Sequence, residues 1–326
     1  MKKFVALTAM LALFCVAAFA QKPRKITIQK QSYRGWNDAL VMSNGIVEAV
    51  IVPSIGRVMQ FRFAGESEGV FWENAALAGK PVNPTSNDWG NFGGDKSWPA
   101  PQSEWPKITP RAWPPPVAFD SMPCTAEIKG DAVELTTPID PHYGIRVRRT
   151  ITLDARLPAM HIKTAYEKVE GEPRKVSIWV ITQLPEPVMV YVPLPANSIN
   201  ANGYVMQSKT APPSLKRAAN LLSMTRDKTT AYKIGTDAST MLWMGEKFAV
   251  RIDSPRQPNA EHPDSGSSAE VYTNADPLAY VELETLGPLR DMKKGDRSIE
   301  HGNRYTLYRR GKKAVADEAQ QILKQK

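Results

Sequence analysis

The sequence predicts an all-β protein built as one large β-sandwich, and two observations lead to that prediction. Short stretches in which apolar and polar residues alternate recur along almost the whole chain, which is typical of strands with one buried face. Helical periodicity does not alternate with these stretches, so the pattern of a parallel sheet with crossover helices is absent. Many strands without such helices indicate a sandwich or a barrel. Because a sandwich can exceed the usual domain length, residues 21–326 are expected to form a single domain.

The predicted strands cover residues 46–52, 57–63, 70–72, 125–129, 132–136, 145–153, 159–167, 176–183, 241–244, 248–252, 270–273, 279–285 and 305–308. Residues 215–222 are compatible with a short helix. Only the tail, residues 312–324, has clear helical periodicity, with Val315, Ala319 and Ile322 at positions i, i+4 and i+7. We therefore expect a sandwich that ends in a short helix.

The first twenty residues have the features of a signal peptide. Lys2 and Lys3 give a basic start, residues 4–19 are almost wholly apolar, and Ala18-Phe19-Ala20 supplies a small-x-small cleavage site. We therefore expect cleavage after Ala20 and a periplasmic or secreted protein. No later stretch approaches 18 consecutive apolar residues, so stable membrane insertion is not expected.

The charge and the cysteines exclude some function classes. The formal net charge is +9 and falls to +7 when the signal peptide takes two lysines with it. The basic residues are scattered, and an exported protein does not meet nucleic acid, so no nucleic-acid partner is expected. A solvated surface is the preferred interpretation, and attraction to acidic polymers is the alternative. Cys124 is the one cysteine left after cleavage, so no intrachain disulfide can form.

The alternation is interrupted between residues 79 and 123. This region holds ten of the 27 prolines and four of the eight tryptophans. A flexible linker is poor in tryptophan, so we predict an ordered loop that packs over one face of a sheet. Residues 91–102, with a double glycine at Gly93-Gly94, form its centre.

The late strand at residues 279–285 is the strongest candidate for a functional surface. Strand alternation places Val281 and Leu283 toward the core and Tyr280, Glu282 and Glu284 on the opposite face. Carboxylates on an apolar strand are costly unless they are paired or face a wet cleft. A sugar site needs such a face, because sugar hydroxyls require acceptors and the ring requires an aromatic surface.

Three separated segments, in the right order, resemble the galactose mutarotase-like (aldose 1-epimerase-like) superfamily. The turn Asn44-Gly45 precedes two hairpin strands, Gly93-Gly94 leads to Trp98-Pro99, and Leu283-Glu284-Thr285 is followed by a closing strand near Tyr305. More narrowly, residues 93–102 with 178–184 and 282–284 are similar to an uncharacterised exported bacterial family within that superfamily. The resemblance covers about residues 37–310. It implies a large sandwich with a sugar in its concave face.

The resemblance also implies an acid–base reaction at the anomeric carbon. Mutarotation needs one group to take the anomeric proton and another to protonate the ring oxygen. The family's base is the glutamate of the Leu-Glu-Thr segment, which is Glu284 here. The family's acid is a histidine on a mid-chain strand, but residues 178–184 offer Trp179 and Gln183 and no histidine. His142, in a turn, is the candidate substitute.

The remaining candidates are expected to bind substrate. Asp95 and Lys96 follow the double glycine and either approach a ligand or belong to an ion pair that stabilises the loop. Trp98 and Trp179 either stack on a sugar ring or pack within the protein, and Gln183 is assigned to the cleft wall. Glu282 is assigned to ligand contact or to a salt bridge with Lys96 or an arginine.

No cofactor or metal is expected. His262-Pro263-Asp264 lacks the spacing of an established metal site, calcium held by scattered oxygens stays open, and no phosphate loop or nucleotide fingerprint is visible. The expected partner is a mono- or oligosaccharide, and the sequence does not specify an oligomeric state. Three hypotheses therefore stand: an epimerase-like enzyme, a non-catalytic carbohydrate-binding protein, and a structural module of the cell envelope.

Expression in a bacterium with a general secretion system tests the export prediction. We expect the mature protein in the periplasm or medium, with Gln21 as its first residue, as read by N-terminal sequencing or intact mass. Retention in the cytoplasm with residues 1–20 attached would contradict it.

Overall fold

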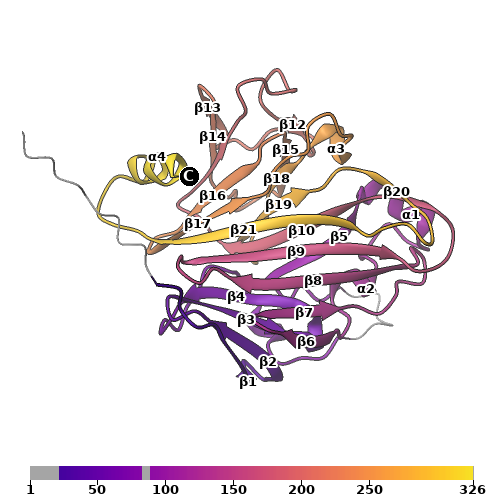
Figure 1. Cartoon of the computed structure of the whole chain (residues 1–326). Helices are drawn as coiled ribbons and strands as arrows, with labels where there is room; N and C mark the ends of the chain where they lie inside the picture. The colour runs from indigo at the N-terminus through magenta and orange to yellow at the C-terminus, as the bar shows by residue number, and fades with distance from the viewer. Residues whose placement is uncertain (1–21, 83–88, 326) are drawn as a thin grey trace, which may run out of the picture.

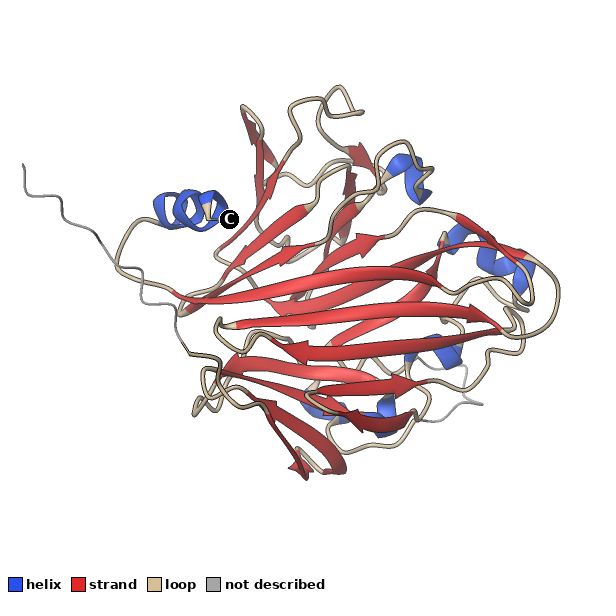
Figure 2. Ribbon diagram, in the orientation of Figure 1, coloured by secondary structure: helices blue, strands red, loops and turns tan. Residues whose placement is uncertain are grey.

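The computed structural model describes residues 22–82 and 89–325 and consists mainly of two antiparallel β-sheets packed face to face (Figure 1). Strands dominate, and the few helices are short and lie at the margins of the sheets (Figure 2). The predicted all-β sandwich is thereby confirmed. The expected signal peptide, residues 1–20, lies outside the described residues.

The larger sheet has 11 strands in the described part of the chain. Its hydrogen-bonded order is β1 (Thr27–Tyr33), β2 (Trp36–Ser43), β3 (Val47–Val52), β4 (Arg57–Phe63), β5 (Asp95–Ala100), β10 (Arg174–Pro185), β19 (Tyr280–Leu286), β18 (Ala269–Thr273), β15 (Tyr232–Thr236) and β12 (Val205–Met206), with β20 (Arg290–Met292) paired to β10.

The smaller sheet has ten strands among the same described residues. Its order is β13 (Lys216–Ala218), β14 (Leu221–Met224), β11 (Met189–Pro193), β16 (Thr240–Met244), β17 (Phe248–Asp253), β21 (Ile299–Arg309), β9 (Ala159–Lys168), β8 (Ile145–Leu153), β7 (Ala132–Thr136) and β6 (Thr125–Lys129). The helices are α1 (Trp105–Ile108), α2 (Val117–Asp120), α3 (Pro263–Gly266) and α4 (Val315–Lys324), and the 3₁₀ turns are η1 (Pro53–Ile55), η2 (Ala75–Leu77) and η3 (Gln102–Glu104).

The main core lies between the two sheets. Val281 and Leu283 of β19 and Met160 and Ile162 of β9 belong to one buried apolar cluster that both sheets build. The period of two along each strand explains this, because alternate side chains of both sheets point into the space between them. The opposite face of the larger sheet is thereby left for other side chains.

A buried polar bridge crosses this core. The Arg149 guanidinium of β8 forms an ion pair with the Asp95 carboxylate of β5, and Arg149 Nη1 donates to the Asp95 carbonyl at 3.0 Å. Thr182 Oγ1 and the Tyr305 hydroxyl each donate to Asp95 Oδ2 at 2.7 Å. Because Arg149 and Tyr305 belong to the smaller sheet, these bonds fix β5 relative to it.

The prediction of a long loop over residues 79–123 is wrong in one respect, because the centre of this region is a strand, β5. β5 pairs with β10 along its whole length and with β4 at Val58–Asp95, so it lies inside the larger sheet. Pro99 concealed it, since a proline argues against an inner strand. Gly93 and Gly94 adopt positive φ values of 92° and 72°, and a Cβ at Gly93 would lie 2.2 Å from the Trp72 carbonyl oxygen. Only glycine allows that close approach before the strand begins.

Three further expectations differ from the structure. Residues 70–72 are not a strand, and residues 215–222 contain β13 and the start of β14 instead of a helix. The strands without a counterpart in the predicted set include β1, β2, β11, β12, β15 and β20. β13 pairs with β14, so tertiary pairing overrides the local helical pattern there. The C-terminal helix is confirmed as α4, with Ala319 and Ile322 buried against residues of β11 and β16.

Because of the polar bridge, substitutions of two neighbouring arginines of β8 should have very different effects on the free energy of unfolding. Arg149→Met leaves the fully buried Asp95 carboxylate without its ion-pair partner and should lower the free energy of unfolding by about 3–5 kcal/mol. Arg148→Met removes only exposed ion pairs with Glu134 and Glu167 and should change it by less than about 1 kcal/mol. Urea unfolding of both variants measures the difference. Equal losses would show that the bridge does not hold the sheets.

Candidate functional site

The polar side chains of strand β19 lie on the face of the larger sheet that points away from the core. They form the first part of the candidate site. Val281 and Leu283 are buried between the sheets, whereas Glu282 and Glu284 project from the other face. Across the β10–β19 pair, Gln183 lies opposite Glu282, so both side chains leave the sheet on the same face. The orientation expected for this strand is therefore observed.

The double-glycine segment reaches this same face, although nearly two hundred residues separate it from β19. Trp98 of β5 lies opposite Trp179 of β10 in the sheet register. Two residues earlier, Lys96 places its Nζ atom 3.7 Å from Glu282 Oε1. The structure thus brings Lys96, Trp98, Trp179, Gln183 and both glutamates together.

Trp98, Trp179 and the two glutamates border a cavity of about 280 Å³, whereas Lys96 and Gln183 are not part of its lining. Its aromatic lining consists of Trp89, Trp98, Trp113, Trp179, Tyr272 and Tyr280. Its polar lining consists of Gln102, Lys233, Asn274, Glu282 and Glu284. Indole faces and carboxylates therefore meet in one hollow, which we call the tryptophan cavity.

Asp120 of α2 holds two of these indoles in place. Its Oδ1 accepts hydrogen bonds from Trp98 Nε1 and from Arg57 Nη2, both at 2.8 Å, and its Oδ2 accepts one from Trp89 Nε1 at 3.2 Å. The rings of Trp89 and Trp98 meet edge to face with centroids 5.9 Å apart. A buried carboxylate with these donors fixes the ring orientations before any ligand arrives.

Lys233 of β15 is shared by two buried glutamates, and burial raises the pKa of one of them, Glu270, well above its ordinary value. Lys233 Nζ lies 2.6 Å from Glu270 Oε2 and 2.8 Å from Glu284 Oε2. Glu284 Oε2 also accepts a hydrogen bond from Trp179 Nε1 at 2.7 Å. Burial disfavours the charged amine, but the two carboxylates outweigh it and raise the pKa of Lys233. Glu284 is therefore part of a buried ion pair.

Glu282 has a different environment. Gln183 Nε2 donates to its Oε1 at 2.8 Å, while the Lys96 amine, at 3.7 Å, has no hydrogen-bond partner among the described residues. Burial raises the pKa of Glu282 to about 7, against the opposing charge of Lys96. Burial likewise lowers the pKa of Lys96 to about 8. Of these two groups only Glu282 lines the tryptophan cavity, so its carboxyl is the one that can exchange a proton with a bound hydroxyl.

The model of the family described as "Domain of unknown function (DUF4380)" matches residues 38–308. The chain belongs to the DUF4380 family. No curated protein sequence matches this DUF4380 chain.

Solved structures share its fold at low sequence identity. A galactose mutarotase-like protein from Lactobacillus casei is 8% identical, with a TM-score of 0.57 over 83% of this chain and 100% of that one. A galactose mutarotase-like protein from Clostridium acetobutylicum is 9% identical, with a TM-score of 0.52 over 89% and 100%. A TPR-domain containing protein from Parabacteroides distasonis is 14% identical, with a TM-score of 0.52, and this chain spans only 46% of its length. The DUF4380 chain therefore has the galactose mutarotase-like fold.

Four residues assigned to the site from the sequence do not line the tryptophan cavity. Lys96 and Gln183 lie next to it and contact Glu282, whereas Asp95 and His142 lie elsewhere in this DUF4380 protein. Asp95 points from β5 into the core between the sheets, on the face opposite to Lys96, because consecutive strand residues alternate. His142 is exposed in the turn before β8 and is not among the residues that line the tryptophan cavity. Asp95 is a bridge residue, and the His142 turn does not reach the cavity.

The sequence reasoning also missed several residues of the site. Lys233 and Glu270 lie on β15 and β18, and Trp89 and Trp113 lie in the loops on either side of β5. Tyr272 sits across from Glu282 in the β18–β19 register. The alternation of residues 270–273 could have placed Glu270 and Tyr272 on one face, but no local signal connects Lys233 to Glu284.

Within residues 22–82 and 89–325, no group of three or more His, Cys, Asp or Glu side chains is arranged to hold a metal ion. Every helix in those ranges is too short or too polar to span a bilayer.

The raised pKa of Glu282 predicts a pH-dependent difference in stability. Its ordinary value is 4.5 and its folded value about 7, so between these pH values the unfolded chain ionises while the folded chain keeps the proton. The free energy of unfolding should therefore fall as pH rises from about 4.5 to 7, relative to Glu282→Gln.

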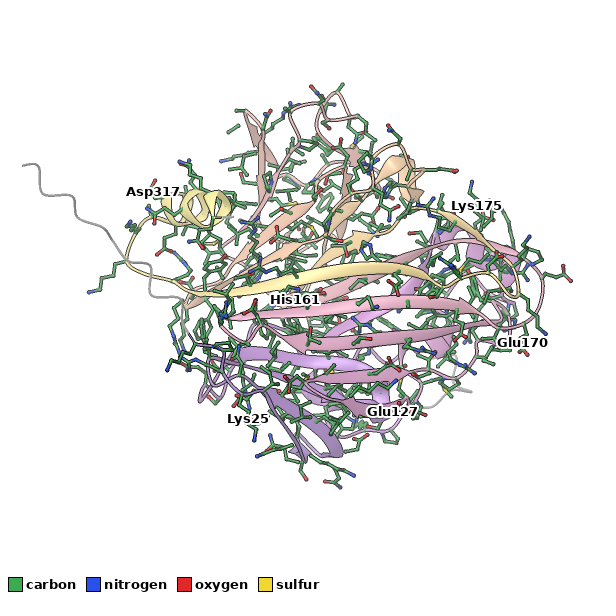
Figure 3. All side chains as sticks on the ribbon, in the orientation of Figure 1. Lys25, Glu127, His161, Glu170, Lys175 and Asp317 are labelled. Atoms are coloured by element: carbon green, nitrogen blue, oxygen red, sulfur yellow. The ribbon has the colours of Figure 1, made fainter. Side chains whose placement is uncertain are left out.

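Urea unfolding at several pH values measures this difference. Glu127→Gln is the matched control, because Glu127 is exposed on β6 at the surface of the smaller sheet (Figure 3). Parallel pH curves for wild type and Glu282→Gln would contradict the assignment.

Proposed function

We propose that this chain is a carbohydrate-active protein of the aldose-epimerase type, which holds a mono- or oligosaccharide in the tryptophan cavity. The observation that carries the proposal is the meeting of four indoles with two carboxylates in one hollow of the larger sheet. Sugar hydroxyls donate to carboxylates, and the C–H faces of a pyranose pack on aromatic rings. The galactose mutarotase-like fold supports this choice by analogy.

The size and surroundings of the cavity support a carbohydrate. Its volume of about 280 Å³ suits a small ligand. A neighbouring hollow of about 400 Å³ shares Gln102, Trp179 and Lys233 with it. A second one, of about 620 Å³, shares Trp89, Asn274 and Tyr280. A longer glycan can therefore extend from the tryptophan cavity in either direction.

In this proposal Glu284 is the general base or a sugar ligand. Its carboxylate forms an ion pair with Lys233 and can accept a hydrogen bond from a sugar hydroxyl. The hydrogen bond from Trp179 Nε1 orients the carboxylate beside the indole on which a sugar can stack. Glu284 thereby links the charged and aromatic parts of the site.

One observation favours a second candidate, a non-catalytic carbohydrate-binding protein. No histidine lines the tryptophan cavity among the described residues, and both acceptor contacts of Glu284 Oε2 are already used by Lys233 and Trp179. A base whose oxygen is occupied in this way abstracts protons less readily. In either case we propose that the protein is exported, on the strength of residues 1–20.

Sugar binding is the first test of the proposed function. We expect glucose, galactose or one of their oligosaccharides to quench tryptophan fluorescence in a saturable way. Trp113→Ala, which truncates an indole at the exposed rim, should weaken binding about tenfold by titration calorimetry, or about 1.4 kcal/mol.

The control truncates an exposed apolar side chain outside the cavity. Ile199→Ala should bind as wild type does, since Ile199 is 60% exposed and does not line the cavity. Polarimetry on fresh α-glucose and α-galactose, with wild type and Glu284→Gln, then separates the enzyme from the binding protein. Absence of binding to every sugar in the series would remove the proposed function.

A further inference from the structure

We propose that Glu282 is the general acid of this site and Glu284 its base, so that two carboxyls of one strand divide the work that mutarotation requires. The inference rests on the proposed function and deepens it, because it names a proton donor in place of the histidine that residues 178–184 do not provide. The geometry that points to it is that both glutamates line one cavity but have different partners. Glu284 is ion-paired with an ammonium, whereas Glu282 accepts a hydrogen bond from an amide.

The two carboxyls can reach one sugar together. Glu282 and Glu284 are at positions i and i+2 of β19, share a face and both line the tryptophan cavity. Their Cα atoms are roughly 6.5–7 Å apart in an extended strand. The anomeric oxygen and the ring oxygen are bonded to the same carbon, so a single sugar edge can lie between the two carboxyl groups with hydrogen bonds of about 2.7–3.0 Å.

Their partners give the two glutamates different charges. Glu284 is ion-paired with Lys233 at 2.8 Å and accepts a hydrogen bond from Trp179, which favours the carboxylate. Glu282 has no ammonium within hydrogen-bond distance, and Glu284 repels its negative charge. When two carboxyl groups share one buried site, the group that lies farther from a cation keeps its proton to higher pH.

The titratable and charged groups around Glu282 come from several strands, and Tyr280 of the same strand is one of them. Burial is the largest cause of the raised pKa of Glu282, followed by the lowering effect of Lys96, the raising effect of Glu284 and the lowering effects of Lys233 and Gln183. Tyr272 faces it from β18. The more distant pair of Arg57 and Asp120 is neutral overall.

Lys96 is a positioning residue in this assignment. Its side chain is fully buried, and its Nζ lies 4.7 Å from the centroid of the Trp98 ring and 5.3 Å from that of Trp89. It is not among the residues that line the cavity. Its ammonium therefore acts on a ligand through Glu282, whose pKa it lowers.

The step balances without a further reactant. Glu284 takes the proton of the anomeric hydroxyl, and that O–H electron pair forms the C1=O double bond. The bond between C1 and the ring oxygen breaks, its electron pair goes to the ring oxygen, and that oxygen takes the proton of Glu282. After rotation about C1–C2 the reverse step closes the ring on the other face of the carbonyl and returns both protons.

Polarimetry on fresh α-glucose and α-galactose, with fluorescence titration of the same sugars, tests the assignment. Glu282→Gln keeps the shape of the side chain, so we expect binding within threefold of wild type and a rate at least 100-fold lower. Glu127→Gln, an exposed glutamate on β6, should keep the wild-type rate.

The pH profile distinguishes a proton donor from a structural carboxyl and does not require the Glu282 variant to fold. Wild-type kcat/KM should fall on the alkaline side with an apparent pKa near 7, as Glu282 loses its proton. Lys96→Met removes the charge that lowers this pKa, so it should move the alkaline limb to higher pH.

The outcomes separate this inference from the proposed function. Sugar binding with an unchanged rate in Glu282→Gln, or with no acceleration by wild type, would overturn the acid–base assignment and leave carbohydrate binding intact. An alkaline limb that Lys96→Met does not move would also overturn it. If neither sugar binds, both the proposed function and this inference fail.

Discussion

The buried pair of Asp95 and Arg149 is the constraint on which the rest of the site depends. It crosses the space between the two sheets and is supported there by Thr182 and Tyr305. A buried ion pair contributes little net stability, because desolvation offsets its attraction, but removing one partner is strongly unfavourable. The pair therefore specifies where β5 lies. Once Asp95 is fixed in the core, alternation along the strand directs Lys96 to the opposite face.

The site on that opposite face concentrates buried charge among aromatic rings. Lys233 Nζ lies 4.3 Å from the centroid of the Trp179 ring, and Lys96 Nζ lies 4.7 Å from that of Trp98. Each ammonium thus has an indole face and a glutamate as neighbours, and both contacts offset the loss of hydration. The two lysines differ in the distance to the glutamate, since Lys233 Nζ lies 2.6 Å and 2.8 Å from its carboxylate partners and Lys96 Nζ lies 3.7 Å from Glu282. That difference gives the glutamates their separate roles in the proposal.

The fold of this chain does not by itself identify its function. Sequence identities of 8% and 9% accompany TM-scores of 0.57 and 0.52 for two galactose mutarotase-like proteins. A sandwich tolerates such divergence, because the alternation of apolar residues, and not their identity, sets the architecture. Catalysis, in contrast, depends on the identity of particular side chains, which similarity of fold does not preserve. The function of this DUF4380 protein is therefore argued from Glu282, Glu284 and the indoles around them, and not from the architecture.

The sequence by itself determined the features that depend on local periodicity. The alternation of residues 279–285 was sufficient to place Glu282 and Glu284 on one face, and the spacing of Ala319 and Ile322 was sufficient to predict α4. The tertiary structure decided which distant groups meet. β5 was concealed by Pro99, and Asp95 could not be separated from Lys96 until the strand itself was recognised. Lys233 reaches Glu284 across two strand pairings, and register between strands is set by non-local contacts that no local pattern encodes.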